Sequence, residues 1–309
     1  MSEESREIQS ADCMPLGVEW GTLALIFGCY GGWLAVLFLL APFSLPLAIL
    51  CLSLFCALHS SLTHEALHGH PFRSRWINEA LMFFPLTLLI PYGRFRDTHL
   101  AHHQDERLTD PYDDPESNFQ DPGAWQKMPA WRRAILEVNN TLLGRIVIGP
   151  LLGQICFMAD DWRQARAGDH AIRRDWLLHA LGLVPVIWIA QASPLPLWAL
   201  LLAAYAGLAL IKIRTFLEHR AHEECHNRTV VIEDRGPLAW LFLNNNLHIV
   251  HHKHPGVPWY ALPRLYRQNR DAFLEVNGGY RYSSYREVFG KYFLRRKDPV
   301  PHPLWPFQR

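Results

Sequence analysis

Hydrophobic and charged positions are strongly segregated along this chain. No Asp, Glu, Lys or Arg occurs in residues 21–64 or in residues 176–211. A helix that crosses a bilayer needs about 20 apolar residues, so each run is long enough for two such helices. The segments APFSLP at 41–46 and ASPLPL at 192–197 interrupt the runs near their middles with turn-forming residues. The pattern therefore predicts two transmembrane hairpins, at about 21–63 and 176–217.

The distribution of Lys and Arg predicts the orientation of these hairpins in the membrane. All 30 Lys and Arg residues lie outside the two charge-free runs. Segments rich in Lys and Arg stay in the cytoplasm, so both termini are expected on the cytoplasmic side and both hairpin turns outside. Residues 1–20 lack the basic start and short apolar core of a cleaved signal peptide. The sequence therefore predicts an integral protein of the inner (cytoplasmic) membrane.

Two further uncharged runs, 80–93 and 146–159, are too short to span a bilayer and contain proline and glycine. We expect both to lie at the membrane interface. Residues 218–300 are polar, aromatic and rich in basic side chains, which is typical of a cap that contacts headgroups. The expected fold is a single all-α domain over 1–309, with four transmembrane helices and a cytoplasmic helical cap.

Composition narrows the function classes. The formal net charge is +1 and charged residues make up only 19% of the chain, which argues against nucleic-acid binding and against disorder. The unusual feature is histidine, which occurs 17 times and mostly in clusters. These clusters direct attention to metal chemistry.

Three histidine boxes follow the predicted hydrophobic segments: HEALHGH at 64–70, HLAHH at 99–103 and HIVHH at 248–252. Side chains spaced i, i+3 and i+4 lie on one face of a helix, as joint metal coordination requires. All three boxes should meet at the cytoplasmic membrane boundary. The candidate ligands in the boxes are His64, His68, His99, His102, His103, His248, His251 and His252. Isolated histidines, such as His59 and His179, are expected to be ordinary core or surface residues.

Two other classes of protein would also use part of this pattern. HEALH fits the HExxH signature, in which two histidines bind zinc and the glutamate, here Glu65, is the general base. A catalytic zinc uses three protein ligands, so a zinc intramembrane protease would leave most of the boxed histidines without a role. A metal-binding transport protein is expected to hold its ligands near the middle of the bilayer, whereas these boxes lie at the ends of apolar runs.

The three boxes, with YGRFRDTHLAHHQDERLTDPYDDPES and FLNNNLHIVHHKHPGVPWYALP around the second and third, resemble the membrane fatty acid desaturase superfamily, in particular a bacterial desaturase-like branch. The superfamily also includes acyl-lipid hydroxylases, alkane monooxygenases and carotenoid ketolases. The resemblance covers about residues 20–300. It implies a non-haem centre of two iron ions bound by histidines, with O2 as co-substrate and electrons from a donor such as ferredoxin or rubredoxin.

The resemblance also implies a ninth ligand from the end of the fourth transmembrane helix. The segment TFLEHRAHEE offers His219 and His222. We favour His219, because FLEHR is similar to the Glu-His pair found there in alkane monooxygenases. The fourth apolar run ends at Ile211, and two more helical turns would carry His219 to the interface. Thr215 stands where some desaturases have an asparagine, which makes a water-mediated asparagine ligand at that position doubtful.

Polar neighbours of the boxes are expected to orient the rings. Glu65, Glu218 and Asn246 are the candidates for this role. The acidic run DERLTDPYDDPE at 105–116 is expected instead to form solvated turns, with docking of a basic electron donor as its alternative.

The function expected from these features is oxygen-dependent oxidation of an unactivated C–H bond in a long-chain acyl lipid, with fatty acid desaturation as the first interpretation. Hydroxylation, alkane-type monooxygenation and oxidative decarboxylation by the same kind of centre are the alternatives within the superfamily. The zinc protease and the metal-binding transport protein are the alternatives from other classes.

Overall fold

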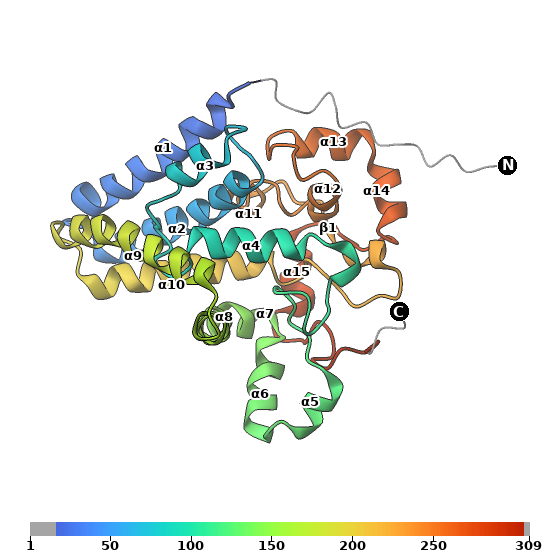
Figure 1. The fold of residues 1–309 in the computed structure, drawn as a ribbon. Coiled ribbons are helices and arrows are strands. Elements are labelled where there is room, and N and C mark those ends of the chain that lie inside the picture. Colours follow the sequence, from blue (N-terminus) through green and yellow to red (C-terminus); the bar gives the residue numbers. More distant parts are fainter. Residues whose placement is uncertain (1–16, 306–309) are drawn as a thin grey trace. The chain divides into compact units, whose positions relative to one another are not determined.

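The computed structural model describes residues 17–305, and their regular secondary structure is almost entirely helical (Figure 1). The chain divides into two compact units. One comprises residues 99–143 and 214–305 and is called the polar unit; the other comprises Gly17–Thr98 and Gly144–Ile213 and is called the apolar unit. The expectation of an uncleaved, cytoplasmic N-terminus concerns mainly residues 1–16, which lie outside the described residues.

The apolar unit consists mainly of long helices, with two short ones, η2 and α3. They are α1 (Trp20–Ala35), the π-helix η2 (Val36–Leu40), α2 (Leu45–Leu67), α3 (Arg75–Leu81), α8 (Gly149–Arg166), α9 (His170–Gln191) and α10 (Leu197–Arg214). Two more helices, α4 (Tyr92–His102) and α7 (Leu142–Val147), belong partly to each unit.

Three helical segments in the described part of the chain are long and apolar enough to cross a membrane: Trp20–Leu40, Leu45–Leu67 and Leu197–Arg214. They confirm the predicted class of all-helical membrane protein. α9 is not one of the three, and it carries Arg173, Arg174 and Asp175 within its first two turns. A fourth span, and with it the arrangement in two hairpins, stays a prediction.

Small residues allow the apolar helices to approach closely. α1 packs against α2, and a Cβ atom at Gly32 would lie 2.2 Å from the ring of Phe55. Between α2 and α10, a Cβ atom at Gly207 would lie 2.5 Å from the Cβ of Cys56. Such contacts are typical of helices that associate in lipid, where close packing takes the place of the hydrophobic effect.

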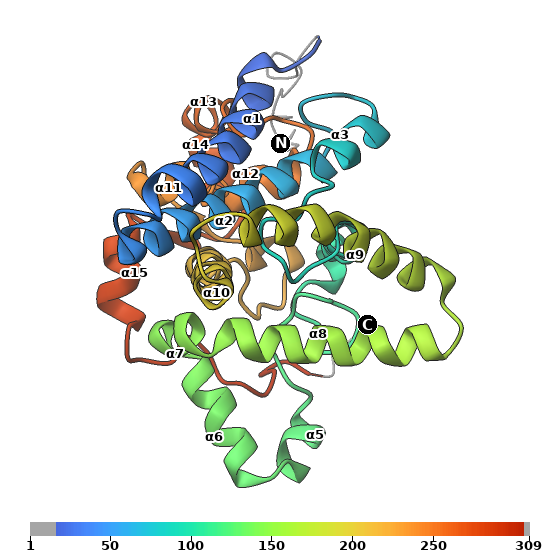
Figure 2. The same cartoon turned by 90° about the vertical axis from the view of Figure 1, so that its left-hand side faces the viewer.

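The two short runs expected at the interface have different structures. Between α3 and α4 the chain is mostly irregular, and Leu88 adopts a φ of 64°. The run 146–159 is helical: it contains the end of α7 and the first part of α8, which continues to Arg166. After α8 the chain turns at Gly168 and continues into α9, as Figure 2 shows, and the two helices are in contact. The position of either run at a membrane surface stays a prediction.

The polar unit consists of short helices and one small sheet. Its elements are η3 (Asp105–Arg107), α5 (Pro122–Lys127), α6 (Ala130–Asn139), η4 (Cys225–Arg228), β1 (Val231–Ile232), α11 (Pro237–Leu241), α12 (His248–Lys253), α13 (Leu262–Gln268), α14 (Arg270–Val276), β2 (Arg281–Tyr282) and α15 (Tyr285–Tyr292). The two strands are parallel, with Val231 opposite Arg281 and Ile232 opposite Tyr282.

This sheet and a hydrophobic cluster position α12, which carries the third histidine box. The Ile249 amide donates to the carbonyl of Val230 at 3.0 Å, and the Ile232 amide donates to the carbonyl of Asn246 at 2.8 Å. α13 and α14 follow α12 in the polar unit (Figure 1) and bury Leu265 and Phe273 against Val250. The backbone at both sides of His248 is therefore held by β1 and by the core.

Candidate metal centre

The second histidine box is divided by the geometry of α4. His99 and His103 are four residues apart, and their Nε2 atoms lie 3.0 Å from each other. His102, three residues after His99, turns its Nε2 to His219 instead, at 2.9 Å. The histidines of this box therefore contribute to two separate groups of ligands.

The third box is divided in the same way on α12. His251 approaches His103, with 3.1 Å between their Nε2 atoms. The Nε2 of His248 lies 3.2 Å from that of His219, and the ring centroid of His252 lies 4.6 Å from that of His248. In each of these two boxes, the pair at i and i+4 joins one group and the remaining histidine joins the other.

Two groups result within the polar unit. The four-histidine group consists of His102, His219, His248 and His252, and one ligand atom from each lies within 4.8 Å of the others. The three-histidine group consists of His99, His103 and His251, which meet the same distance limit. The groups adjoin, because the rings of His103 and His252 stack with centroids 4.3 Å apart.

In His99, His102 and His248, the nitrogen atom turned away from the groups, Nδ1, has a polar partner. The Nδ1 of His102 donates to Asp114 Oδ1 at 2.7 Å, and the Nδ1 of His99 donates to Glu116 Oε1 at 2.9 Å. The Nδ1 of His248 lies 3.0 Å from Asn245 Oδ1. These acceptors hold a proton on Nδ1, so Nε2 is the nitrogen atom that can offer a lone pair to a metal ion.

This proton arrangement is what a bound cation requires. The Nε2 atoms of His102 and His248 both lie close to His219 Nε2, and two unprotonated nitrogen atoms cannot hydrogen-bond to each other. A metal ion satisfies all of them together, and carboxylates behind the ligating rings are common in histidine-bound metal sites. The residues of the four-histidine group therefore fit a metal ion.

The electrostatics of the polar unit lead to the same conclusion. Burial disfavours the charged form of His102, but the carboxylates of Glu116 and Asp114 outweigh it and raise its pKa to about 9. Burial and neighbouring rings hold the pKa values of His219 and His248 well below the usual range. The two carboxylates thus stabilise a positive charge on His102, and a metal cation bound at its Nε2 would replace the second proton and supply that charge instead.

Placement of His219

The structure brings His219 to the four-histidine group by a route that the sequence did not indicate. α10 ends at Arg214, so the expectation of two further helical turns is wrong. His219 instead forms an antiparallel bridge with Thr229, and the Oγ1 of Thr229 lies 3.2 Å from its Nδ1. His222 does not join the group, and its Nδ1 accepts a hydrogen bond from the amide of Glu224 at 3.1 Å.

Other predicted and missed residues

The first box lies in the apolar unit. His64 is in the last turn of α2, His68 caps that helix, and their ring centroids are 4.9 Å apart. Glu65 is buried, and its Oε1 lies 3.9 Å from His64 Nδ1. The spacing of the box therefore keeps its two rings together, as expected for two ligands of one metal ion.

Two of the three orienting residues proposed from sequence, Asn246 and Glu218, differ in whether they contact the third box. Asn246 donates to the carbonyls of Ile232 and Asp234 rather than to the third box, and Asn245 contacts His248 in its place. Glu218 pairs with Arg214 at 3.0 Å, and its Oε1 also lies 3.8 Å from His248 Nδ1.

The residues that sequence analysis missed lie in the acidic run 105–116. It was expected to form solvated turns, but the Asp114 side chain is only 2% exposed, and that expectation is wrong for it. Asp114 accepts from the amides of Thr109 and Glu116 as well as from His102. The signal in the sequence was its position shortly after the second box, which allows the chain to fold back onto α4.

The family model described as "Fatty acid desaturase" matches residues 32–284. This range contains the three boxes, His219 and the acidic run. A search of curated proteins finds no match.

Proposed function

The chain belongs to the fatty acid desaturase family, and from this premise we propose that it is a membrane-bound oxidoreductase with two histidine-ligated iron ions. Its reaction is the oxygen-dependent oxidation of a C–H bond in a long-chain acyl lipid, with desaturation as the outcome. The observation that carries the proposal is the pair of adjoining histidine groups, His102, His219, His248 and His252 beside His99, His103 and His251.

We assign one iron ion to each group. In the four-histidine group the ligands are the Nε2 atoms of the boxed residues and of His219. His64 and His68 complete the ligands of the other ion; this assignment rests on the three-box pattern of the sequence. A single catalytic zinc uses three protein ligands, so the four-histidine group, which does not contain the HExxH residues, favours two metal sites over a zinc protease.

Iron bound by these nitrogens supplies the oxygen activation and electron transfer that oxidation of an unactivated C–H bond needs. The protein residues hold the ligands in place. Asp114 and Glu116 keep the protons of His102 and His99 on Nδ1. Neutral imidazoles leave the metal its full positive charge, whereas carboxylate ligands would neutralise it. His99, His102 and His248 are each at most 2% exposed, which limits access of water.

The family and the apolar helices support a membrane location, and we extend this to four spans in two hairpins, with the site and both termini at the cytoplasmic side of the inner membrane. An acyl chain then enters from the bilayer, while a donor such as ferredoxin or rubredoxin delivers electrons from the cytoplasm. This arrangement rests on the positive-inside rule.

Metal analysis of the purified full chain tests the centre. We expect about two iron ions per chain and, in His252→Ala, loss of iron, because a ligand of the four-histidine group is removed. The matched control is His170→Ala, since His170 is exposed at the start of α9. One tightly bound zinc ion per chain, retained in His252→Ala, would contradict the proposal and favour the protease.

The reaction is tested by lipid profiles of cells with and without the gene. New double bonds that depend on O2 and disappear in His252→Ala are expected. Hydroxylated chains or terminal alkenes would assign the chain to another reaction of the same kind of centre. No change in any lipid, with a full iron content, would contradict acyl-lipid oxidation.

A further inference from the structure

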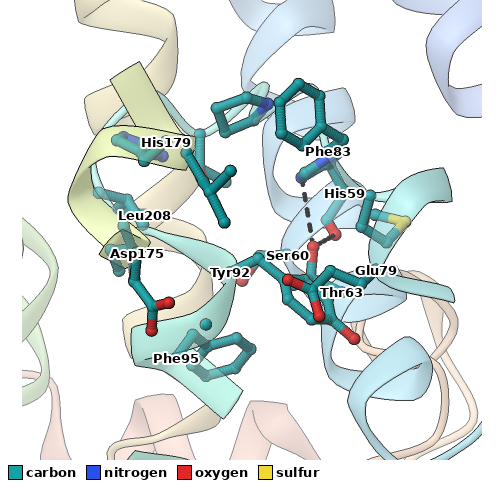
Figure 3. A pocket seen from close by; sticks show the side chains of 16 residues that line it. His59, Ser60, Thr63, Glu79, Phe83, Tyr92, Phe95, Asp175, His179 and Leu208 are labelled. Atoms are coloured by element: carbon teal, nitrogen blue, oxygen red, sulfur yellow. Dashed lines mark hydrogen bonds between the residues drawn. The ribbon is translucent and has the colours of Figure 1, made fainter. Parts of the chain in front are cut away.

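The apolar unit contains a cavity that neither histidine group explains. Its walls come from α2, α3, the segment 82–91, the start of α4, α9 and α10. Figure 3 shows Asp175 and His179 of α9 facing Ser60, Thr63 and Glu79 across this space. The apolar part of the wall consists of Met82, Phe83, Pro85, Ile90, Phe95, Leu178 and Leu208.

Two buried oxygen atoms at this cavity have no hydrogen-bond partner within residues 17–305: Asp175 Oδ2 and Tyr92 Oη. The Oδ1 atom of Asp175 is already paired with Arg174, whose NH2 atom lies 2.8 Å away. The Asp175 side chain is only 3% exposed, so water outside the protein does not satisfy the second oxygen. A buried polar group without a partner costs stability, and a ligand that pairs with it would recover that cost.

The backbone makes room for the carboxylate. A Cβ atom at Gly93 would lie 2.3 Å from Asp175 Oδ2, so only glycine allows this oxygen to rest against α4. Tyr92 and Gly93 are consecutive cavity residues at the start of the same helix. Tyr92 and Asp175, which carry the two oxygen atoms without partners, are therefore both part of the cavity wall.

The polar side chains in the wall comprise carboxylates, hydroxyl groups and histidine rings. Besides Asp175, the cavity is lined by the carboxylate of Glu79, by the hydroxyl groups of Ser60, Thr63, Thr87 and Tyr92, and by the rings of His59 and His179. Among the described residues, no Lys or Arg lines it. Asp175 and Glu79 are each paired with an arginine, but Asp175 Oδ2 still lacks a donor. An ionised carboxylate has no proton to donate to this oxygen, whereas a hydroxyl or an ammonium group would donate to it.

We propose that this cavity binds the polar end of an alkyl chain that donates a hydrogen bond, a hydroxyl or an amino group, and that it excludes a free carboxylate. The alkyl part packs on the apolar wall formed by residues such as Phe83, Phe95 and Leu208. Thr63 lines the cavity and is followed directly by His64 of the first box. The identification of this ligand with the substrate rests on the proposed function: the substrate class is then a hydroxyl- or amino-bearing lipid rather than a free fatty acid.

Competition binding to the full chain in nanodiscs tests the cavity, with tritiated octan-1-ol as the probe and empty nanodiscs subtracted. We expect octan-1-amine to compete as well as octan-1-ol, and octanoate to compete at least about tenfold more weakly, the size of one lost charged hydrogen bond. Octanoate competing as well as the alcohol would overturn the proposal.

Variants locate the binding. In Asp175→Asn the carbonyl oxygen turns to Arg174 and the amide nitrogen replaces Oδ2, so the acceptor becomes a donor. We expect Asp175→Asn and Tyr92→Phe each to bind octan-1-ol about tenfold more weakly. The matched controls are Asp160→Asn, at an exposed acid of α8, and Tyr205→Phe, which removes a hydroxyl bonded to the Val147 carbonyl. Both should bind like the wild type.

If Asp175→Asn fails to fold, Gly93→Ala tests the same oxygen by displacing it, and it should also weaken binding. Wild-type affinity in both Tyr92→Phe and Gly93→Ala would overturn the proposal. Iron content measured on the same samples separates this inference from the proposed function. Selective octan-1-ol binding in a chain without iron would support the cavity and contradict the proposed oxidase. A chain that binds iron and oxidises lipid, but whose octan-1-ol affinity is unchanged in Asp175→Asn and Tyr92→Phe, would support the oxidase and contradict the cavity.

Discussion

Asp114 offers the sharpest test of the proposed metal centre, because it contacts a candidate ligand, His102, and is not itself one of the histidine ligands. Its Oδ1 accepts from His102 Nδ1 at 2.7 Å and from the Glu116 amide at 2.9 Å, while Oδ2 accepts from the Thr109 amide at 2.8 Å. Asp114→Asn has only one carbonyl oxygen, which can accept either from His102 and the Glu116 amide or from the Thr109 amide. Either the amide nitrogen faces the Thr109 N–H, or it faces His102 and displaces its proton from Nδ1 to Nε2.

Both arrangements weaken metal binding at His102. In the first, two donors oppose each other and the turn that carries Asp114 opens; in the second, the proton on Nε2 must leave before a metal can bind. Loss of a group that orients a ligating histidine typically reduces metal affinity by about 10- to 100-fold, which corresponds to about 1.4 to 2.7 kcal/mol. We expect Asp114→Asn to lie within this range.

The assay is iron retention of the purified protein against increasing concentrations of a chelator. Asp271→Asn is the matched control, since the Asp271 side chain is 99% exposed. Circular dichroism on the same samples shows whether the variant is folded. An Asp114→Asn protein that is folded and retains iron within about twofold of the wild type would refute the reasoning, because a reduction of at least about tenfold is expected from the loss of an orienting group.

Four further predictions follow from particular contacts. His219→Ala should lose iron as His252→Ala does, while His222→Ala keeps it; equal iron in His219→Ala and the wild type would remove His219 from the site. Gly207→Val should lower the melting temperature, because its Cβ would meet Cys56 at 2.5 Å, and an unchanged melting temperature would contradict the close approach of α2 and α10. Hydrogen bonds from Arg270, Tyr266 and Arg281 lower the pKa of Glu233 to about 2, so its stabilising contribution is complete above its usual pKa of 4.5 and is lost as the pH falls from there toward 2. The difference in stability between the wild type and Glu233→Gln should therefore shrink over that range, and a constant difference would exclude the ionised carboxylate as its cause. Reporter fusions at Ser44 and Ser193 should be external; a cytoplasmic result at either would contradict the two-hairpin topology.

The sequence by itself determined the features that depend on neighbouring residues. Charge-free runs predicted the apolar segments that become α1, α2 and α10, because the cost of burying a charge in lipid acts on each residue separately. The spacing of the boxes placed His99 and His103, and likewise His248 and His252, one helical turn apart, because a helix repeats every 3.6 residues. Both kinds of prediction need only local geometry.

The tertiary structure decided which nitrogen atoms meet. Helical spacing places three rings along one side of α4, but it does not show that His102 joins His219 while His99 and His103 join His251. It also does not show that α10 stops at Arg214 and leaves His219 on a bridge to Thr229. These outcomes depend on contacts between distant segments, which a local pattern does not encode.

The same reason explains the acidic residues. Asp114 stands in a run that was expected to form solvated turns, and Asp175 directly precedes the second charge-free run, yet both side chains are nearly buried. Asp114 is buried because the chain after α4 folds back onto His102, and Asp175 because Gly93 of another helix admits its carboxylate. Whether a carboxylate faces water, a histidine or a cavity is set by the segment packed against it, and only the folded chain determines that segment.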